Sequence, residues 1–182
     1  MGAVSLKVKD LPHYVYDDYV QWEGKWELIE GIPYAMTPAP NIRHQDISGN
    51  IYWQLKSQLE YCKKCKVLLP VDWQITDDTI VQPDILIVCD ENIGDVKLEK
   101  TPVMIFEVLS TSTSRKDRGI KYRLYENAGV KYYCIVDPET NSAEIFVLQK
   151  EKYHEANEFT EGRMFFDLGP CQIQFDFKEI FK

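Results

Sequence analysis

The chain has 182 residues, of which 45% are hydrophobic and 13% aromatic, and its formal net charge at pH 7 is −8. This composition excludes a disordered or fibrous protein and fits one globular domain over residues 1–182, large enough to bury a core without a structural metal. The acidic excess also disfavours nonspecific binding to polyanions. A nucleic-acid role therefore needs a local basic patch or metal ions, and basic residues gather only in KKCK and RKDRGIKYR.

No run of about 18 apolar residues occurs, and the N-terminus mixes charged and apolar residues where a signal peptide needs an apolar block. We therefore expect a soluble, cytoplasmic protein without membrane contact. The odd number of cysteines and the apolar surroundings of Cys89 and Cys134 favour reduced thiols. Cys62-x-x-Cys65 has a metal-like spacing, but zinc needs two further ligands. A zinc or redox role is thus the less favoured interpretation.

The first expected elements are a short helix in DDYVQW and a hairpin in KWELIEGIPYAM, which turns near Gly31 and Pro33. Glu30 ends the first strand of this hairpin. An amphipathic helix is then predicted over residues 42–62, and His44 falls on its apolar face. The apolar residues that define this face, spaced every four positions, are Ile47, Ile51, Leu55 and Leu59.

Three β-rich runs come next, VLLPVDWQI, TIVQPDILIVCD and TPVMIFEVLS. The second and third are apolar on both alternating faces, which is typical of central strands in a sheet covered on both sides. A second helix is predicted from Ser114 to a stop at Gly129, followed by the strands VKYYCIVD and SAEIFVLQK. A less regular strand and a short helix complete the chain. This order predicts an α/β layer architecture.

Each of two central strands places one carboxylate inside an apolar run, Asp84 in IVQPDILIV and Glu107 in VMIFEVLS. A buried carboxylate without a partner costs several kcal/mol or becomes protonated. If the strands pair, both side chains can bind one Mg²⁺, which takes one or two protein carboxylates together with phosphate oxygens and water. Alternatively, each acid lies at a strand end and accepts backbone hydrogen bonds. Two such acids on neighbouring strands favour the metal.

Lys121 is the third candidate. At 100° per residue, it shares an arc of the second helix with Ile120 and Leu124, so it should face the sheet. A buried lysine is rare unless it is paired. The alternative is an i,i+4 ion pair with Asp117 on a solvated helix face.

These residues resemble a nuclease family. Pro83 and Asp84, followed 23 positions later by Glu107 in a strand, are similar to the signature of the PD-(D/E)xK nuclease superfamily. The strings ELIEG, RHQDISGNIYWQL, VQPDILIV and FEVLSTSTSRKDRGIKYRLYENAGVKYYCIVDP more specifically resemble the Uma group of restriction-endonuclease-like proteins. The resemblance implies an α/β, restriction-endonuclease-like fold with an αβββαβ core. It further implies a central mixed β-sheet flanked by helices, an N-terminal hairpin and extra C-terminal strands.

The resemblance also implies hydrolysis of DNA phosphodiester bonds that depends on Mg²⁺ or Mn²⁺, with Asp84 and Glu107 as metal ligands. Superfamily members carry a lysine two residues after the second acid, where this chain has Leu109. The resemblance suggests that Lys121 supplies this amine from the following helix. It also assigns Glu30 as an additional metal or water ligand, with an ordinary strand-end acid as an equal alternative.

His44 matches the start of the corresponding helix in the family, although a histidine satisfied on the helix face is favoured over a ligand. Three functions fit these residues. The favoured one is a metal-dependent DNA endonuclease that acts as a homodimer, because two copies of one site most simply cut two strands. The second is an inactive nucleic-acid-binding or assembly module on a nuclease fold, which Leu109 and the acidic charge permit. The third is a metallophosphodiesterase for small substrates.

Overall fold

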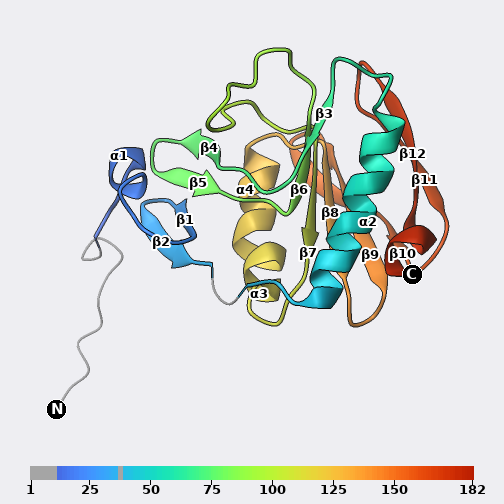
Figure 1. Ribbon diagram of the computed structural model, residues 1–182, viewed down its shortest axis with the longest axis horizontal. Helices are drawn as coiled ribbons and strands as arrows, with labels where there is room; N and C mark the ends of the chain where they lie inside the picture. The colour runs from blue at the N-terminus through green and yellow to red at the C-terminus, as the bar shows by residue number, and fades with distance from the viewer. Residues whose placement is uncertain (1–11, 37–38) are drawn as a thin grey trace.

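A six-stranded mixed sheet forms the centre of the molecule (Figure 1). The computed structural model describes residues 12–36 and 39–182. The strands, in their order across the sheet, are β10 (Lys152–Phe159), β9 (Ser142–Gln149), β8 (Tyr132–Asp137), β7 (Met104–Val108), β6 (Ile85–Val88) and β3 (Lys66–Leu68). β7 and β8 are parallel, and the other neighbouring pairs are antiparallel. The predicted mixed sheet is confirmed.

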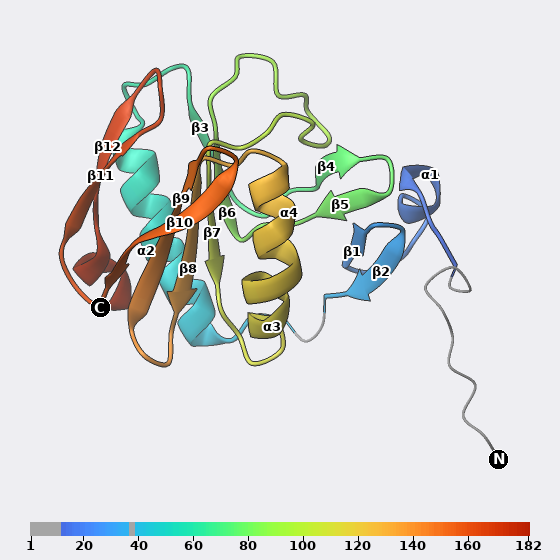
Figure 2. The same ribbon diagram turned by 180° about the vertical axis from the view of Figure 1, so that it is seen from behind.

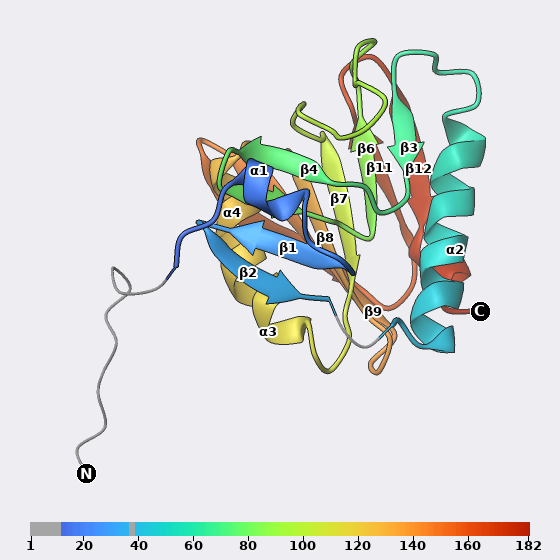
Figure 3. The ribbon, with the colours of Figure 1, turned by 60° about the vertical axis from the view of Figure 1, so that its left-hand side comes forward.

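Helices cover both faces of this sheet, as the αβββαβ core requires (Figure 3). α2 (Ile42–Gln58) packs on one face together with the hairpin of β11 (Arg163–Asp167) and β12 (Gln172–Asp176) and the 3₁₀ helix η3 (Phe177–Phe181). A helical segment made of α3 (Ser114–Lys116), η2 (Asp117–Lys121) and α4 (Tyr122–Asn127) lies on the other face. Side chains of β6 alternate between the two apolar layers, because successive strand residues point to opposite faces. Both layers are therefore built from the doubly apolar strands that the sequence shows.

A smaller antiparallel sheet stands beside the main one (Figure 2). Its strands, in order, are β2 (Ile32–Ala35), β1 (Trp26–Ile29), β5 (Thr79–Val81) and β4 (Trp73–Thr76), with α1 (Tyr16–Tyr19) beside them. The predicted N-terminal hairpin is confirmed. The prediction that VLLPVDWQI and TIVQPDILIV each form one strand is wrong, because each run is divided between the two sheets. Pro70 and Pro83 lie between the divided strands, where a residue without an N–H cannot continue a ladder.

Both predicted helices are present, but their bounds and regularity differ from the prediction. α2 ends at Gln58 rather than at residue 62. The second helical segment contains a five-residue π-helix over Asp117–Lys121, which periodicity alone does not reveal. Its last helical residue is Asn127, and the predicted stop, Gly129, follows the C-cap residue Ala128 with a positive φ of 83° that suits a residue without a Cβ. Within the described ranges, no helix is both long and apolar enough to span a bilayer.

The cysteine prediction is wrong for four of the five residues. Disulfides join Cys62 to Cys171 and Cys65 to Cys89, and only Cys134 is free and buried. Cys65 immediately precedes β3 and Cys89 immediately follows β6, and these strands pair with Lys66 opposite Val88. The pairing therefore places Cys65 and Cys89 opposite each other, a proximity that only the sheet register creates.

Candidate active site

A pocket of about 360 Å³ lies where the small sheet meets the start of α2 and the end of β7. Hydroxyl-bearing residues 110–113, in the loop after β7, form part of its wall. Its charged and imidazole side chains are Lys25, His44, Asp84, Glu107, Lys116, Asp117 and Lys121. The three residues singled out most strongly from the sequence, Asp84, Glu107 and Lys121, thus line one cavity.

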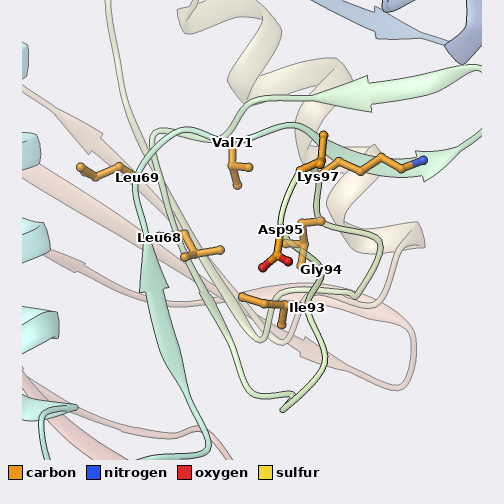
Figure 4. Close-up of a pocket in the computed structure, with 9 residues that line it drawn as sticks. Leu68, Leu69, Val71, Ile93, Gly94, Asp95 and Lys97 are labelled. Carbon is orange, nitrogen blue, oxygen red and sulfur yellow. The ribbon is translucent and has the colours of Figure 1, made fainter.

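A second pocket, of about 180 Å³, lies at the loop after β6. Figure 4 shows the aliphatic side chains of Leu68, Val71 and Ile93 around Asp95, while the chain of Lys97 extends away. A single exposed carboxylate offers no pair of groups for metal binding or acid–base chemistry. The pocket lined by Asp84, Glu107 and Lys121 is therefore the candidate active site.

Sheet pairing brings Asp84 and Glu107 together. Ile85 of β6 lies opposite Phe106 of β7, so the next step of the antiparallel register places Asp84 beside Glu107. Asp84 Oδ2 accepts a hydrogen bond from the Val108 backbone N–H at 2.8 Å. Asp84 therefore lies beside Glu107, as the metal hypothesis expects, and it also accepts a backbone hydrogen bond, as the alternative expects.

Lys121 lies among carboxylates rather than on a solvated face. Its side chain is 3% exposed, and its Nζ lies 2.8 Å from Glu107 Oε1 and 2.9 Å from Glu27 Oε1. Asp117 Oδ1, one helical turn earlier, is 3.7 Å away. The π-helix carries both Asp117 and Lys121, and such turns frequently occur at functional sites. Leu109, at the usual lysine position, packs in the apolar layer under α4.

Glu27, rather than Glu30, contacts the lysines of the site. The structure places Glu30 on the exposed turn between β1 and β2, with a φ of 51°, and outside the pocket lining. Glu27, in β1, is fully buried, forms ion pairs with Lys116 and Lys121, and accepts a hydrogen bond from the Gln82 backbone N–H at 3.0 Å. The sequence does contain a signal for Glu27, because this carboxylate lies within the apolar run WELI.

Burial gives the carboxylates of the site different proton affinities. Burial raises the pKa of Glu107 well above its usual range, and Asp117, Asp84 and Glu27 add to this rise against the opposing effect of Lys121. Burial also raises the pKa of Asp117. Burial alone would raise the pKa of Glu27, but Lys121 and Lys116 outweigh it and lower that pKa. Glu107 and Asp117 thus hold a proton more tightly than free carboxyl groups do, because their ionised forms are disfavoured in the cluster.

This donor set suits a hard divalent cation. Asp117 Oδ1 is, among the residues the structure describes, the one buried side-chain oxygen or nitrogen without a hydrogen-bond partner. Asp84, Glu107 and Asp117 line the same cavity. Carboxylate oxygens are the protein ligands that Mg²⁺ prefers, and a cation would offset the repulsion that raises the pKa of Glu107. The residues therefore fit the metal that the family resemblance implies.

Replacing Asp117 by Asn should stabilise the metal-free protein. Because the pKa of Asp117 is raised in the fold, its ionised form destabilises the fold at pH values above the usual aspartate range, and stability falls as pH rises through the folded pKa. Asp117→Asn removes this charge and should add about 1 kcal/mol, or about 2–4 °C in Tm, at neutral pH. Calorimetry in EDTA measures it, with the exposed Asp95→Asn as a matched control. A lower Tm for Asp117→Asn would contradict this expectation.

Several side chains support these acids. His44 Nε2 lies 3.2 Å from Asp84 Oδ2. Burial would lower the pKa of His44, but Asp84 outweighs it and raises that pKa. The Tyr125 hydroxyl donates to Glu107 Oε1 at 2.7 Å, and the Tyr133 hydroxyl donates to the Asp117 carbonyl oxygen at 3.0 Å. His44 thus has a polar partner, as the sequence favoured. That partner is Asp84, a candidate metal ligand.

Comparisons with known proteins agree with this fold. Residues 16–170 match the family model Uma2, described as "Putative restriction endonuclease". A search of curated proteins finds no match. Solved structures that are similar include a chain described as "a putative nuclease belonging to DUF820 from Anabaena variabilis ATCC 29413", with a TM-score of 0.75 and 16% identity. That alignment covers 92% of this chain and 97% of the other, and it shows the shared fold.

The family match extends from α1, through both sheets and every charged residue of the pocket, to the β11–β12 hairpin. The chain therefore belongs to the Uma2 family, whose description is "Putative restriction endonuclease".

Proposed function

We propose that this protein is a metal-dependent endonuclease that hydrolyses DNA phosphodiester bonds with Mg²⁺ or Mn²⁺. The observation that carries the proposal is the contact of Lys121 with Glu107 in the pocket that Asp84 also lines. In this proposal Asp84 and Glu107 hold the cation. A bound divalent cation polarises a scissile phosphate and lowers the pKa of a bound water.

The other groups of the pocket bind and orient the substrate. The Lys121 ammonium is fixed by Glu27 and Glu107, so it offsets developing negative charge without reorganising. Lys116, held by its ion pair with Glu27, places a second positive charge at the pocket. The hydroxyl groups and backbone of residues 110–113 border the same space and offer hydrogen-bond donors of the kind that contact phosphate oxygens.

A nuclease screen tests this function. Supercoiled plasmid, single-stranded DNA and RNA are incubated with the protein in Mg²⁺, in Mn²⁺ and in EDTA, beside an Asp84→Ala variant. We expect DNA cleavage with either cation, none in EDTA, and none by the variant. Binding of DNA without cleavage in either cation would favour the nucleic-acid-binding module instead. Cleavage confined to small phosphodiesters would favour the metallophosphodiesterase.

We further propose that the protein works as a cytoplasmic homodimer, because the candidate active site of one chain holds one set of acids for one strand. Light scattering at assay concentration should give about twice the chain mass of 21.3 kDa. A mass equal to that of one chain, with or without DNA, would contradict the dimer while leaving single-strand nicking possible.

A further inference from the structure

Four cysteines from three chain segments meet at one edge of the main sheet. Cys62 follows α2, Cys65 precedes β3, Cys89 follows β6, and Cys171 lies in the β11–β12 turn. The Sγ atoms of Cys62, Cys65 and Cys171 all lie within 4.8 Å of one another. Cys89 is bonded to Cys65, so its sulfur adjoins this group of three without lying within 4.8 Å of every member. We call these residues the four-cysteine cluster.

Once the two disulfides are reduced, the sulfurs lie close enough together to form a thiolate metal site. Zinc held by four cysteines has Zn–S distances of about 2.3 Å in a tetrahedron, which separates the sulfurs by about 3.8 Å. The three sulfurs within 4.8 Å therefore need only small side-chain shifts to surround one ion. Cys62 and Cys65 have the C-x₂-C spacing of zinc sites, and a backbone hydrogen bond of 3.4 Å from the Cys65 N–H to the Cys62 oxygen closes the turn between them.

The surroundings of the cluster suit such an ion. Four thiolates around Zn²⁺ leave a net charge of −2, and the exposed Lys63, Lys64 and Lys66 lie beside the cysteines in sequence. Cys62 and Cys171 are half-buried and line an open surface groove, which gives an ion a path of entry. In the sequence, Cys62 and Cys65 lack the two further ligands that zinc needs, and the fold brings Cys89 and Cys171 close enough to supply them.

We propose that the reduced form of this protein binds one soft divalent ion, Zn²⁺, through Cys62, Cys65, Cys89 and Cys171. Two equivalents of a dithiol reduce the two disulfides, and each dithiol becomes a disulfide as two protein thiols form. Metal binding then releases the four thiol protons, because thiolates are the ligands. The site is separate from the candidate active site, since residues 45–58 of α2, about 21 Å of helix, lie between His44 and Cys62.

The bound ion would hold the C-terminal hairpin to the rest of the fold. Cys171 is 109 residues from Cys62 in sequence, and the ion replaces the disulfide as the link between the hairpin and α2. The same four sulfurs can thus close this edge of the sheet under oxidising or reducing conditions. The metal is structural in this role, because four protein ligands leave no open position for substrate.

The test uses the full chain, reduced with dithiothreitol and freed of reductant under anaerobic conditions. Titration with Co²⁺ should produce the intense visible bands of a tetrahedral thiolate complex, saturating at one ion per chain, and Zn²⁺ should abolish them by displacement. Cys89→Ser and Cys171→Ser should each weaken binding by about 100-fold or more, beyond the loss seen when an outer-shell partner of a metal ligand is removed. Cys134→Ala, which removes the thiol outside the cluster, should bind like the parent.

Three results would overturn the proposal. They are the absence of thiolate bands in the reduced protein, equal bands in the oxidised protein, and unchanged affinity in both serine variants. If reduction alone unfolds the chain, refolding on addition of Zn²⁺ supports the site, and failure to refold contradicts it. The variant Asp84→Asn/Glu107→Gln should keep the thiolate bands, so this test is independent of nuclease activity.

Discussion

The variant Asp84→Asn/Glu107→Gln should lose Mn²⁺ binding in calorimetric titrations and lose metal-dependent DNA cleavage by about 10³-fold or more. Both substitutions keep the shape of the side chain and remove its charge. Asp84 keeps one oxygen for the Val108 N–H, and Glu107 keeps one for the Tyr125 hydroxyl, so the local hydrogen bonds can persist. The expected loss therefore reports on charge rather than on folding.

A matched control for this pair is Asp77→Asn/Glu91→Gln, which neutralises one aspartate and one glutamate that are exposed and lie outside the pocket. It should bind Mn²⁺ and cut DNA like the parent. Mn²⁺ binding by Asp84→Asn/Glu107→Gln with the parent's affinity and stoichiometry would show that these two acids are not the metal ligands.

Neutralising Asp84 and Glu107 should also raise the stability of the metal-free protein, although it lowers the activity. The pKa of Glu107 is raised by burial and by neighbouring acids, so its ionised form opposes folding at neutral pH when no cation is present. Residues that place like charges together at a cost in stability are typical of functional sites.

The layered core of this fold could be predicted from local sequence patterns, and the division of its strands could not. The doubly apolar runs containing Ile85–Val88 and Met104–Val108 indicated central strands, because burial on both faces leaves a direct trace in the sequence. The transfer of Thr79–Val81 to the smaller sheet depends on its pairing with β1, about 50 residues earlier. Such a long-range partner has no local signal beyond Pro83, which interrupts the run.

The candidate site could likewise be predicted only in part from local sequence patterns. Asp84, Glu107 and Lys121 are each anomalous in their own segment, so each could be singled out without a structure. Glu27 is anomalous too, but the family resemblance indicated Glu30, and Glu30 was therefore assigned as the additional metal or water ligand. Asp117 was interpreted only as a surface partner of Lys121. The π-helix carries both side chains, and periodicity based on a regular helix does not predict this irregular turn.

Lys121→Met should lower turnover by about two to four orders of magnitude, because it deletes one positive charge that is fixed in the pocket while keeping most of the apolar stem. From the sequence alone, the variant would be expected to fold almost normally. The structure contradicts that expectation, because the Lys121 ammonium contacts both Glu107 and Glu27 in a buried cluster. Removing one partner of a buried ion pair costs about 3–5 kcal/mol, since the remaining charge is left uncompensated.

The stability loss and the turnover loss can be separated. Destabilisation by Lys121→Met should be largest at neutral pH and shrink as the pH falls, because protonation of Glu107, whose pKa is already raised, removes the uncompensated charge. Turnover is measured well below the Tm and normalised to the folded fraction from circular dichroism. Lys25→Met, which removes an exposed lysine at the rim of the same pocket, should leave Tm unchanged and alter turnover by less than about tenfold.

Lys121→Arg distinguishes a charge that only balances the acids from an amine that acts on substrate. The guanidinium retains the positive charge, so stability should recover further than turnover, because a planar fork cannot occupy the position of a compact ammonium between Glu27 and Glu107. Equal recovery of both would assign Lys121 a purely structural role. Full turnover in Lys121→Met beside an inactive Asp84→Asn would transfer the proposed role to Lys116, whose ammonium already pairs with Glu27 at the same pocket.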